Sequence, residues 1–309
     1  MSNLVVWQVT DEKPGHESQT LGLAEALARL TRTSTRRITN EDMGGLLGLV
    51  LRRSRDSLAF EKPDLIVCCG RRTHLVALAL RFRFGGKVIV LMRPSLPSCF
   101  FDLMVVPIHD STTPNPKVLS TQGTVNSMRP DGQHYTDRGL ILVGGPSRHY
   151  AWSSEHVFRQ IEQVVESSNT VLWTIGTSRR TPPDMELRLA SLPQARATVV
   201  LARETYPGWV ANRMAEVGQA WITEDSVSMV YEALSADVSV GLLEVPRLGS
   251  SRIARGIASL IEGGRVGRFC DWQQGEALPR LKPLAEADRI ATEVLRRWYP
   301  ERVAETHAA

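Results

Sequence analysis

Four titratable side chains surround a Pro-Gly turn near the start of the chain. Asp11, Glu12, His16 and Glu17 lie within TDEKPGHESQT, directly after a short apolar run and ahead of a helical pattern. A carboxylate or an imidazole in such a turn can accept a proton from an attacking hydroxyl group. A single ionisable residue there would only be a helix cap, but four beside one turn are unusual. The sequence predicts an acid–base loop with Asp11, His16 and Glu17 as catalytic candidates.

A second candidate lies in WITEDSVSMVYEAL, which reads as a buried strand, a polar turn and the opening of a helix. One apolar stripe recurs at helical spacing: Val227, Val230, Tyr231 and Leu234. The unpaired backbone N–H groups and the dipole at the start of this helix attract anions. A phosphate would bind there, and Glu232 would meet hydroxyl groups one turn further in. Taken alone, the same residues also describe an ordinary capped helix with a solvated glutamate.

Two more loops follow predicted strands and carry residue types that bind phosphate. GGPSRH begins at Gly144, and its glycines and serine permit a close approach while Arg148 supplies charge. GTSRRTP begins at Gly176, and its paired arginines could hold a diphosphate. Neither loop is a dinucleotide or P-loop fingerprint. A glycine turn and a solvated basic turn are the structural alternatives.

The elements that must position these loops alternate between strands and helices. The predicted strands cover 4–9, 36–39, 64–69, 87–92, 102–106, 139–143, 170–175, 198–202, 220–223, 238–242 and 266–269. The predicted helices cover 17–30, 73–84, 154–167, 184–191, 208–217, 226–235, 250–262 and 284–298. This alternation is typical of right-handed βαβ units and parallel sheets, which bind ligands beyond the carboxyl ends of their strands. We predict an α/β protein with two doubly wound, Rossmann-like domains that face each other across a cleft.

A chain of 309 residues is long enough for two such domains. The segment 108–137 is rich in Pro, Thr, Asn and Gly, and its end reads as a linker. We therefore expect an N-terminal domain at 1–133 and a C-terminal domain at 134–283. A closing helical segment, 284–309, is a candidate to pack back on the first domain.

Composition narrows the class of protein. A hydrophobic fraction of 42% and a charged fraction of 23% are those of a soluble globular chain. The net charge of +4 is mild and the basic residues are spread out, so nucleic acid is not an expected partner. The four cysteines form no C-x-x-C pair, and the N-terminus lacks the features of a signal peptide. We expect a cytoplasmic protein.

One segment raises the question of a membrane surface. Met43 to Leu51 is apolar and is followed at once by Arg52, Arg53 and Arg55. Apolar residues backed by cations are typical of an interfacial anchor. A buried helix followed by a basic turn accounts for the pattern equally well. Peripheral contact with the inner membrane surface therefore stays an open expectation.

Four motifs together resemble the Elm-type mitochondrial-fission protein family, whose plant and bacterial members are similar to glycosyltransferases of GT-B fold. These motifs are TDEKPGHESQTLGLAEAL, GGPSRHYAW, TSRRTPP and TEDSVSMVYEAL, in this order and spacing. The resemblance covers nearly the whole chain. Plant members are known for a role in mitochondrial fission, whereas bacterial members look like sugar transferases of envelope polysaccharide or lipopolysaccharide assembly.

The resemblance implies a role for each motif. The C-terminal domain would hold a nucleotide sugar, with a helix start at the diphosphate and a glutamate on the ribose hydroxyls. The implied donor-site residues are Gly144, Gly145, Ser147, Arg148, Ser178, Arg179, Arg180, Ser226, Ser228, Met229 and Glu232. The N-terminal domain would supply the base and an acceptor-side loop with Lys13, Gly15 and Arg71. Many proteins of this fold carry Gly-Gly or Ser-Gly where this chain has Ser228-Met229, so the resemblance does not fix how closely a ligand approaches the backbone here.

The predicted reaction is inverting, metal-independent transfer of a sugar from a nucleotide-sugar donor to an envelope glycan or glycolipid acceptor. The nucleotide sugar is a substrate, and no cofactor is expected. The absence of an Asp-x-Asp motif agrees with a reaction that needs no metal. Two alternatives stay open: a non-catalytic GT-B scaffold that binds partners, and a nucleotide-sugar epimerase or hydrolase.

Overall fold

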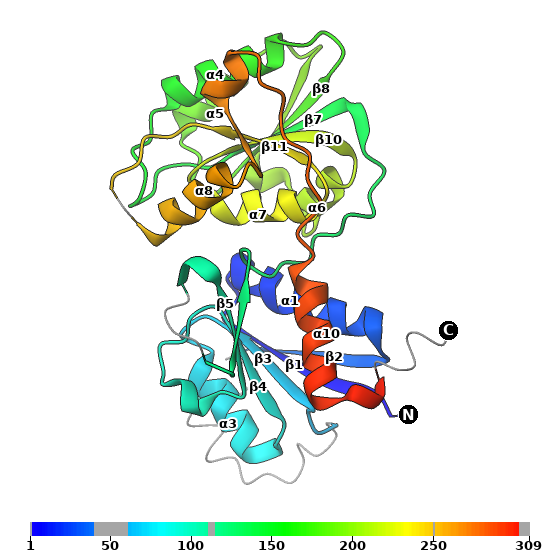
Figure 1. Cartoon of the computed structure of the whole chain (residues 1–309). Helices are drawn as coiled ribbons and strands as arrows, with labels where there is room; N and C mark the ends of the chain where they lie inside the picture. Colours follow the sequence, from blue (N-terminus) through cyan, green and yellow to red (C-terminus); the bar gives the residue numbers. More distant parts are fainter. Residues whose placement is uncertain (1, 40–60, 111–114, 250, 303–309) are drawn as a thin grey trace. The chain divides into compact units, whose positions relative to one another are not determined.

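The computed structural model describes residues 2–39, 61–110, 115–249 and 251–302, in two compact units (Figure 1). Unit 1 comprises Met1–Ser127 with Ala285–Ala309, and unit 2 comprises Met128–Leu284. The apolar segment Met43 to Leu51 and the arginines behind it lie outside the described residues, so the structure does not test the anchor interpretation. Within the described residues, no helix is long and apolar enough to cross a membrane.

Unit 1 is built on a parallel six-stranded sheet in the order β2-β1-β3-β4-β5-β6. Its strands are β1 (Leu4–Thr10), β2 (Thr33–Thr39), β3 (Leu65–Cys69), β4 (Lys87–Leu91), β5 (Leu103–Pro107) and β6 (Val118–Thr121). Because side chains alternate along each strand, the sheet has two apolar faces. Helix α1 (Pro14–Leu30) and helix α10 (Glu286–Trp298) cover one face, and α3 (His74–Phe84) covers the other.

Helix α10 returns the end of the chain to unit 1 and packs against α1 (Figure 1). Its apolar stripe is buried in the same cluster as the sheet residues Leu4 and Val6: Ile290, Ala291, Val294 and Leu295. At the edge of this contact, Arg29 of α1 is paired with Asp288 at 2.5 Å. Unit 1 therefore completes its core only with residues from the far end of the sequence.

The substitution Leu295→Ala should lower the free energy of unfolding by about 3 kcal/mol, because it leaves a cavity between α10 and the sheet. Urea denaturation followed by circular dichroism measures the change. Thr292→Ala, at an exposed position of the same helix, serves as the control and should stay within about 0.5 kcal/mol. Equal stability of the two variants would contradict the packing role of α10.

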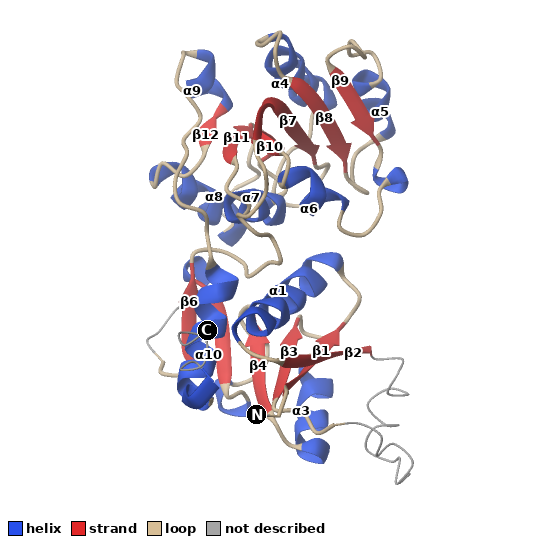
Figure 2. Ribbon diagram, turned by 90° about the vertical axis from the view of Figure 1, so that its right-hand side faces the viewer, coloured by secondary structure: helices blue, strands red, loops and turns tan. Residues whose placement is uncertain are grey.

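Unit 2 contains a second parallel six-stranded sheet, in the order β12-β11-β10-β7-β8-β9 (Figure 2). Its strands are β7 (Tyr135–Val143), β8 (Leu172–Thr177), β9 (Ala197–Val200), β10 (Val217–Thr223), β11 (Ser239–Leu243) and β12 (Gly267–Arg268). Helices α4 (Ser154–Glu166) and α5 (Pro183–Leu189) pack on one face, and α9 (Phe269–Gln273) lies beside β11 and β12. The other face carries α6 (Trp209–Met214), α7 (Val227–Ser235) and α8 (Arg252–Glu262).

The predicted α/β class with two Rossmann-like sheets is confirmed. Three local details differ from the sequence expectation. Helix α1 begins at Pro14, because proline is well suited to the first helical turn, and His16 and Glu17 thus belong to the helix. Strand β6 forms in a segment for which no strand was predicted, because pairing with β5 supplies its hydrogen bonds. The short helix α9 was not expected at all.

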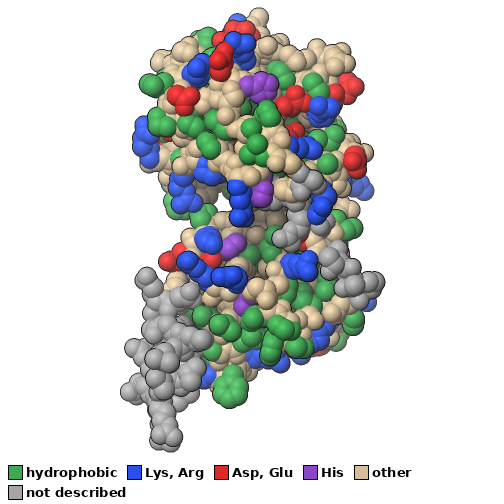
Figure 3. All heavy atoms as spheres, turned by 90° about the vertical axis from the view of Figure 1, so that its left-hand side faces the viewer, with side chains coloured by type: hydrophobic (Ala, Val, Ile, Leu, Met, Phe, Trp, Pro, Cys, Tyr) green, Lys and Arg blue, Asp and Glu red, His purple; other side chains and the backbone are tan. Residues whose placement is uncertain are grey.

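The surface carries charges of both signs. Figure 3 shows one face, on which Lys and Arg side chains lie among hydrophobic and acidic ones over both units. The charged side chains are dispersed along the sequence rather than gathered in a single run.

Candidate functional site

Each sheet has one point where the strand order reverses, and the candidate residues gather at these two points. In unit 1 the reversal falls between β1 and β3, and in unit 2 between β7 and β10. Loops leaving the carboxyl ends of such neighbouring strands run in opposite directions and leave a crevice where ligands bind in α/β proteins. The acid–base loop follows β1, and the predicted donor loops follow β7, β8 and β10.

Asp11 and His16 form a hydrogen-bonded pair at the reversal point of unit 1. The imidazole Nδ1 of His16 lies 2.8 Å from Oδ1 of Asp11. The Asp11 side chain is only 2% exposed, whereas that of His16 is 28% exposed. The carboxylate is therefore fixed inside the protein while the ring reaches solvent. This is the geometry of a base whose orientation is set by a buried acid.

The electrostatics keep Asp11 ionised. Burial would raise its pKa, but the hydrogen bond to His16, the charge of His16 and the nearby Lys13 together hold the pKa below its ordinary value. The ammonium group of Lys13 lies 3.6 Å from the second carboxylate oxygen. In the neutral form of His16, an ionised Asp11 favours the tautomer with the proton on Nδ1, which leaves Nε2 as the acceptor for an incoming proton.

Gly70 makes room for this pair at the end of β3. A Cβ atom on Gly70 would lie 2.4 Å from Nδ1 of His16, and the backbone φ of +92° also favours glycine. Glu12, between β1 and α1, has a positive φ of 62°, a backbone conformation that residues other than glycine rarely adopt. Strained backbone is typical of functional turns.

The other predicted residues of unit 1 have different surroundings. Glu17 accepts hydrogen bonds from Arg37 at 2.6 Å and from the hydroxyl of Thr10 at 3.2 Å. This carboxylate is already neutralised by a cation, so the geometry favours His16 over Glu17 as the base. Lys13, Gly15 and Arg71 are all exposed around the pair.

Asp225 ties together the three candidate loops of unit 2. Its side chain is fully buried, and Oδ2 accepts hydrogen bonds from the backbone N–H of Gly145 at 3.1 Å and from the hydroxyl of Ser226 at 3.3 Å. The same oxygen is paired with Arg180 at 2.7 Å. A Cβ atom on Gly144 would lie 2.3 Å from this oxygen. The glycine is thus required so that the carboxylate can approach. The predicted donor set did not include Asp225.

Arg180 is also part of this internal network. Its guanidinium donates to the carbonyl of Gly145 at 2.8 Å and to the hydroxyl of Ser226 at 3.2 Å. Thr181 donates to the carbonyl of Gly144 at 2.7 Å. These bonds fix the loop after β8 to the loop after β7. Both arginines are exposed, but the guanidinium of Arg180 is engaged in these internal bonds, so Arg179 is the one better placed to reach a ligand.

The remaining donor candidates lie around the same loops. Ser178 accepts a hydrogen bond from the backbone of Arg180 at 3.2 Å, and Ser147 does the same for the backbone of His149 at 3.2 Å. Arg148 is exposed. The two serines thus order their own turns at the carboxyl edge of the sheet.

Helix α7 has the amphipathic pattern that its sequence predicts. Val230, Tyr231 and Leu234 are buried in the core, and Met229 packs partly against it. Ser228 is exposed and Glu232 is half-buried. Ser226 makes no side-chain capping bond at the start of the helix; its hydroxyl interacts with Asp225 and Arg180 instead. The first N–H groups of α7 are therefore not occupied by this cap.

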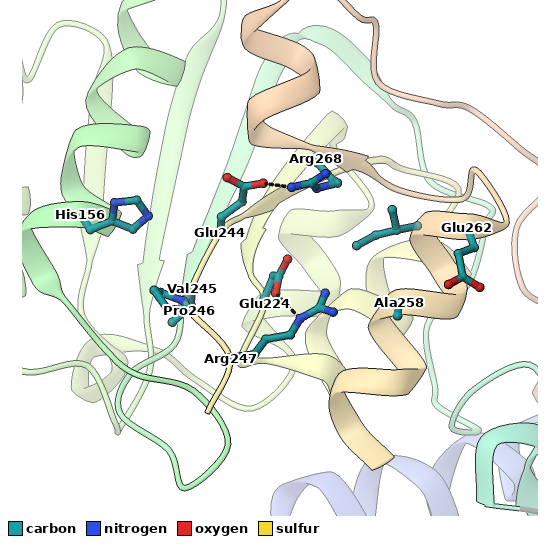
Figure 4. A pocket seen from close by; sticks show the side chains of 10 residues that line it. His156, Glu224, Glu244, Val245, Pro246, Arg247, Ala258, Glu262 and Arg268 are labelled. Atoms are coloured by element: carbon teal, nitrogen blue, oxygen red, sulfur yellow. Dashed lines mark hydrogen bonds and ion pairs between the residues drawn. The ribbon is translucent and has the colours of Figure 1, made fainter. Parts of the chain in front are cut away.

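A cavity of about 580 Å³ lies next to this helix start, at the carboxyl ends of β10, β11 and β12 (Figure 4). Two ion pairs line it: Glu224 with Arg247 at 3.3 Å, and Glu244 with Arg268 at 2.9 Å. Glu224 is only 5% exposed. Burial raises its pKa, and Arg247 opposes this shift. None of these residues was among the predicted site residues. Glu224 and Glu244 each directly follow a buried strand, and this position is the signal in the sequence that could have identified them.

The loops after β7 and β11 are joined by backbone hydrogen bonds. Ala151 donates to the carbonyl of Pro246 at 2.7 Å, and Leu248 donates to the carbonyl of His149 at 2.9 Å. Arg247 lies between these two bonds and is positioned by them. The cavity and the Asp225 network therefore lie side by side at the carboxyl edge of the unit 2 sheet, and hydrogen bonds between the loops hold both in place.

The raised pKa of Glu224 predicts a pH dependence of stability. A carboxyl group with a raised pKa contributes stability that is fully present below its ordinary value of 4.5 and is lost as the pH rises through the folded-state pKa. From pH 4.5 to neutrality, the wild type should therefore lose stability relative to Glu224→Gln. Urea denaturation of both proteins across this range measures the difference. Glu262→Gln removes an exposed carboxylate from the same cavity and tests whether the effect requires burial. A constant difference between wild type and Glu224→Gln would refute the shift.

Comparison with solved structures shows that the chain has the GT-B fold. A Listeria monocytogenes protein assigned as a UDP-N-acetylglucosamine 2-epimerase matches with a TM-score of 0.60 at 14% identity, covering 97% of this chain and 98% of that chain. The UDP-GlcNAc 2-epimerase of Neisseria meningitidis bound to UDP-GlcNAc matches with a TM-score of 0.52 at 13% identity, covering 96% and 100%. The glycotransferase of kitacinnamycin matches with a TM-score of 0.50 at 12% identity, covering 100% and 98%.

The family follows from the sequence. The model of the family described as mitochondrial fission ELM1 matches residues 14–298, so the chain belongs to this family. An uncharacterized protein of Rickettsia prowazekii (strain Madrid E) is 21% identical over 347 aligned positions, which cover 93% of this chain and 96% of that protein. The resemblance seen in the four motifs is thereby confirmed.

Proposed function

We propose that the protein is a glycosyltransferase that moves a sugar from a nucleotide-sugar donor to a glycan or glycolipid acceptor of lipopolysaccharide type. The observation that carries the proposal is the Asp11–His16 pair, a solvent-reaching imidazole held at 2.8 Å by a buried carboxylate. Membership of a family with GT-B fold supports it. All four cysteines are free thiols, which suits a reducing, cytoplasmic setting.

Unit 2 is proposed to hold the donor. The diphosphate would accept hydrogen bonds from the N–H groups at the start of α7, and Arg179 would add charge. Glu232, one turn further along, would bind the ribose hydroxyls. In this proposal Asp225 and Arg180 hold the loops in place rather than contact the ligand. The Neisseria meningitidis structure of the same fold is bound to UDP-GlcNAc, which makes a UDP-sugar the first ligand to test.

Unit 1 is proposed to supply the base. Nε2 of His16 takes the proton of the acceptor hydroxyl as its oxygen forms a bond to the anomeric carbon. The bond from that carbon to the phosphate oxygen breaks, and the nucleoside diphosphate leaves with the electron pair. Attack opposite the leaving group inverts the configuration. Helix N–H groups and Arg179 would stabilise the charge that develops on the diphosphate, so this scheme requires no metal.

The substitution Glu232→Ala should weaken binding of UDP about tenfold, because the bonds that a carboxylate makes to ligand hydroxyls are lost. Isothermal titration calorimetry measures the dissociation constant. Glu216→Ala, at the amino end of β10, removes a carboxylate away from the donor loops and should leave binding unchanged. If the two variants bind UDP equally well, the donor assignment is wrong.

The substitution His16→Ala should lower turnover by at least about a hundredfold while UDP binding persists, because only proton transfer is removed. Release of UDP from a UDP-sugar, with and without candidate acceptors, provides the assay. Glu17→Gln is the matched comparison, and a loss as large as that of His16→Ala would move the base to Glu17. UDP-sugar turnover without any acceptor would favour an epimerase or hydrolase. Absence of both binding and turnover would favour a scaffold.

A further inference from the structure

Helix α3 exposes apolar side chains on the side that does not face the sheet of unit 1. Leu75 is 53% exposed and Phe82, two turns later, is 95% exposed. Phe100 is 48% exposed in the short 3-10 helix Ser98–Phe100. This segment is fixed beside α3, because Arg81 donates to the carbonyl of Phe100 at 3.1 Å. We call Leu75, Phe82 and Phe100 the α3 apolar surface.

The chain segment that carries the α3 apolar surface is basic. From Leu65 to Phe101 the chain has no Asp or Glu, and its basic residues are Arg71, Arg72, Arg81, Arg83, Lys87 and Arg93. Arg71 and Arg72 are exposed just ahead of the helix. Just beyond this segment, Asp102 is paired with Arg81 at 3.4 Å. The ammonium group of Lys87 lies over the ring of Trp298 in α10, on the other face of the sheet. The arginines that lie next to the α3 apolar surface in sequence are therefore Arg72, ahead of the helix, and Arg83, beside Phe82.

The exposed apolar side chains and the arginines beside them together indicate what kind of partner this surface would bind. An almost fully exposed phenylalanine does not gain the free energy that burial of its side chain would provide. An apolar surface bordered by arginines is complementary to a bilayer surface, which is apolar in its interior and anionic at its headgroups. Anionic phospholipid headgroups over acyl chains meet both requirements. By contrast, Leu187 on α5 is exposed at 75% but is flanked by Glu186 and Arg188, charges of both signs.

We propose that unit 1 docks on the surface of an anionic phospholipid bilayer through the α3 apolar surface, with the adjacent arginines on the headgroups. The docking rests on described residues only and is separate from the apolar segment near Met43. It is also independent of the proposed sugar transfer, because a lipid surface can be bound whether or not a sugar is moved. Nucleotide binding measured on the same variants therefore separates the failure of one proposal from the failure of the other.

Flotation of the full chain with lipid vesicles tests the docking. The wild type should float with vesicles of phosphatidylcholine and phosphatidylglycerol, should float less as salt increases, and should not float with phosphatidylcholine alone. Leu75→Ser combined with Phe82→Ser should lower the partition coefficient about tenfold or more. Arg72→Gln combined with Arg83→Gln should lower it by roughly tenfold. Leu187→Ser is the matched control and should float like the wild type. All five substituted positions are at least partly exposed, and unchanged melting temperatures confirm that each variant is folded.

A probe on Cys99 locates the docking face. Cys99 is exposed next to Phe100, whereas Cys68 and Cys69 are buried. With Cys270→Ser as background, a polarity-sensitive fluorophore on Cys99 should shift its emission to the blue when anionic vesicles are added. The proposal is overturned if the wild type does not float with anionic vesicles, or if the Leu75/Phe82 variant floats as well as the wild type. It is also overturned if sedimentation velocity shows a dimer that Phe82→Ser dissociates while the vesicles remain unbound, since the surface would then serve a second copy of the chain.

Discussion

The buried carboxylate of Asp225 holds together the loops at the carboxyl edge of the sheet of unit 2. One of its oxygens meets the backbone of Gly145, the hydroxyl of Ser226 and the guanidinium of Arg180. These partners come from the loops after β7, β10 and β8, which are distant in sequence. A charge with no exposed surface is costly unless it is paired and hydrogen-bonded. The network meets that requirement at Oδ2, whereas Oδ1 is buried with no hydrogen-bond partner among the described residues. The bonds at Oδ2 fix the shape of the helix start that is proposed to receive a diphosphate.

Unit 1 uses the same physical device for a different purpose. Asp11 is nearly as buried as Asp225, but it bonds to an imidazole that reaches solvent. In unit 2 the buried acid orders backbone, whereas in unit 1 it orients a group that can exchange protons. Both acids lie where the strand order of their sheet reverses. A glycine packs against each of these networks: Gly70 lies beside His16, and Gly144 lies beside Asp225. A Cβ atom at either position would overlap the neighbouring side chain.

Sequence reasoning reached the architecture because the apolar periodicity of strands and helices is a local property. The stripe of α7 is an example: Val230, Tyr231 and Leu234 are buried as their spacing predicts. Contacts between loops that are distant in sequence are not a local property. The bonds of Arg180 to the loop after β7, and those of Asp225 to the loops after β7 and β8, therefore could not be predicted from the sequence and are seen only in the structure. Glu224 illustrates the same limit, because a carboxylate after a strand is ordinarily solvated and only the fold shows that this one is enclosed. Strand β6 was missed because its stability depends on its neighbour β5 rather than on its own residues.

The return of α10 to unit 1 has a consequence for the order in which the chain acquires its structure. A ribosome releases residues 1–127 first, yet the core of that unit includes Ile290, Val294 and Leu295. Unit 2 is a continuous segment and can close its own core as soon as residue 284 has emerged. The unit that is synthesised first is therefore completed last, and until then its α1 face presents uncovered apolar surface, a natural binding site for a chaperone.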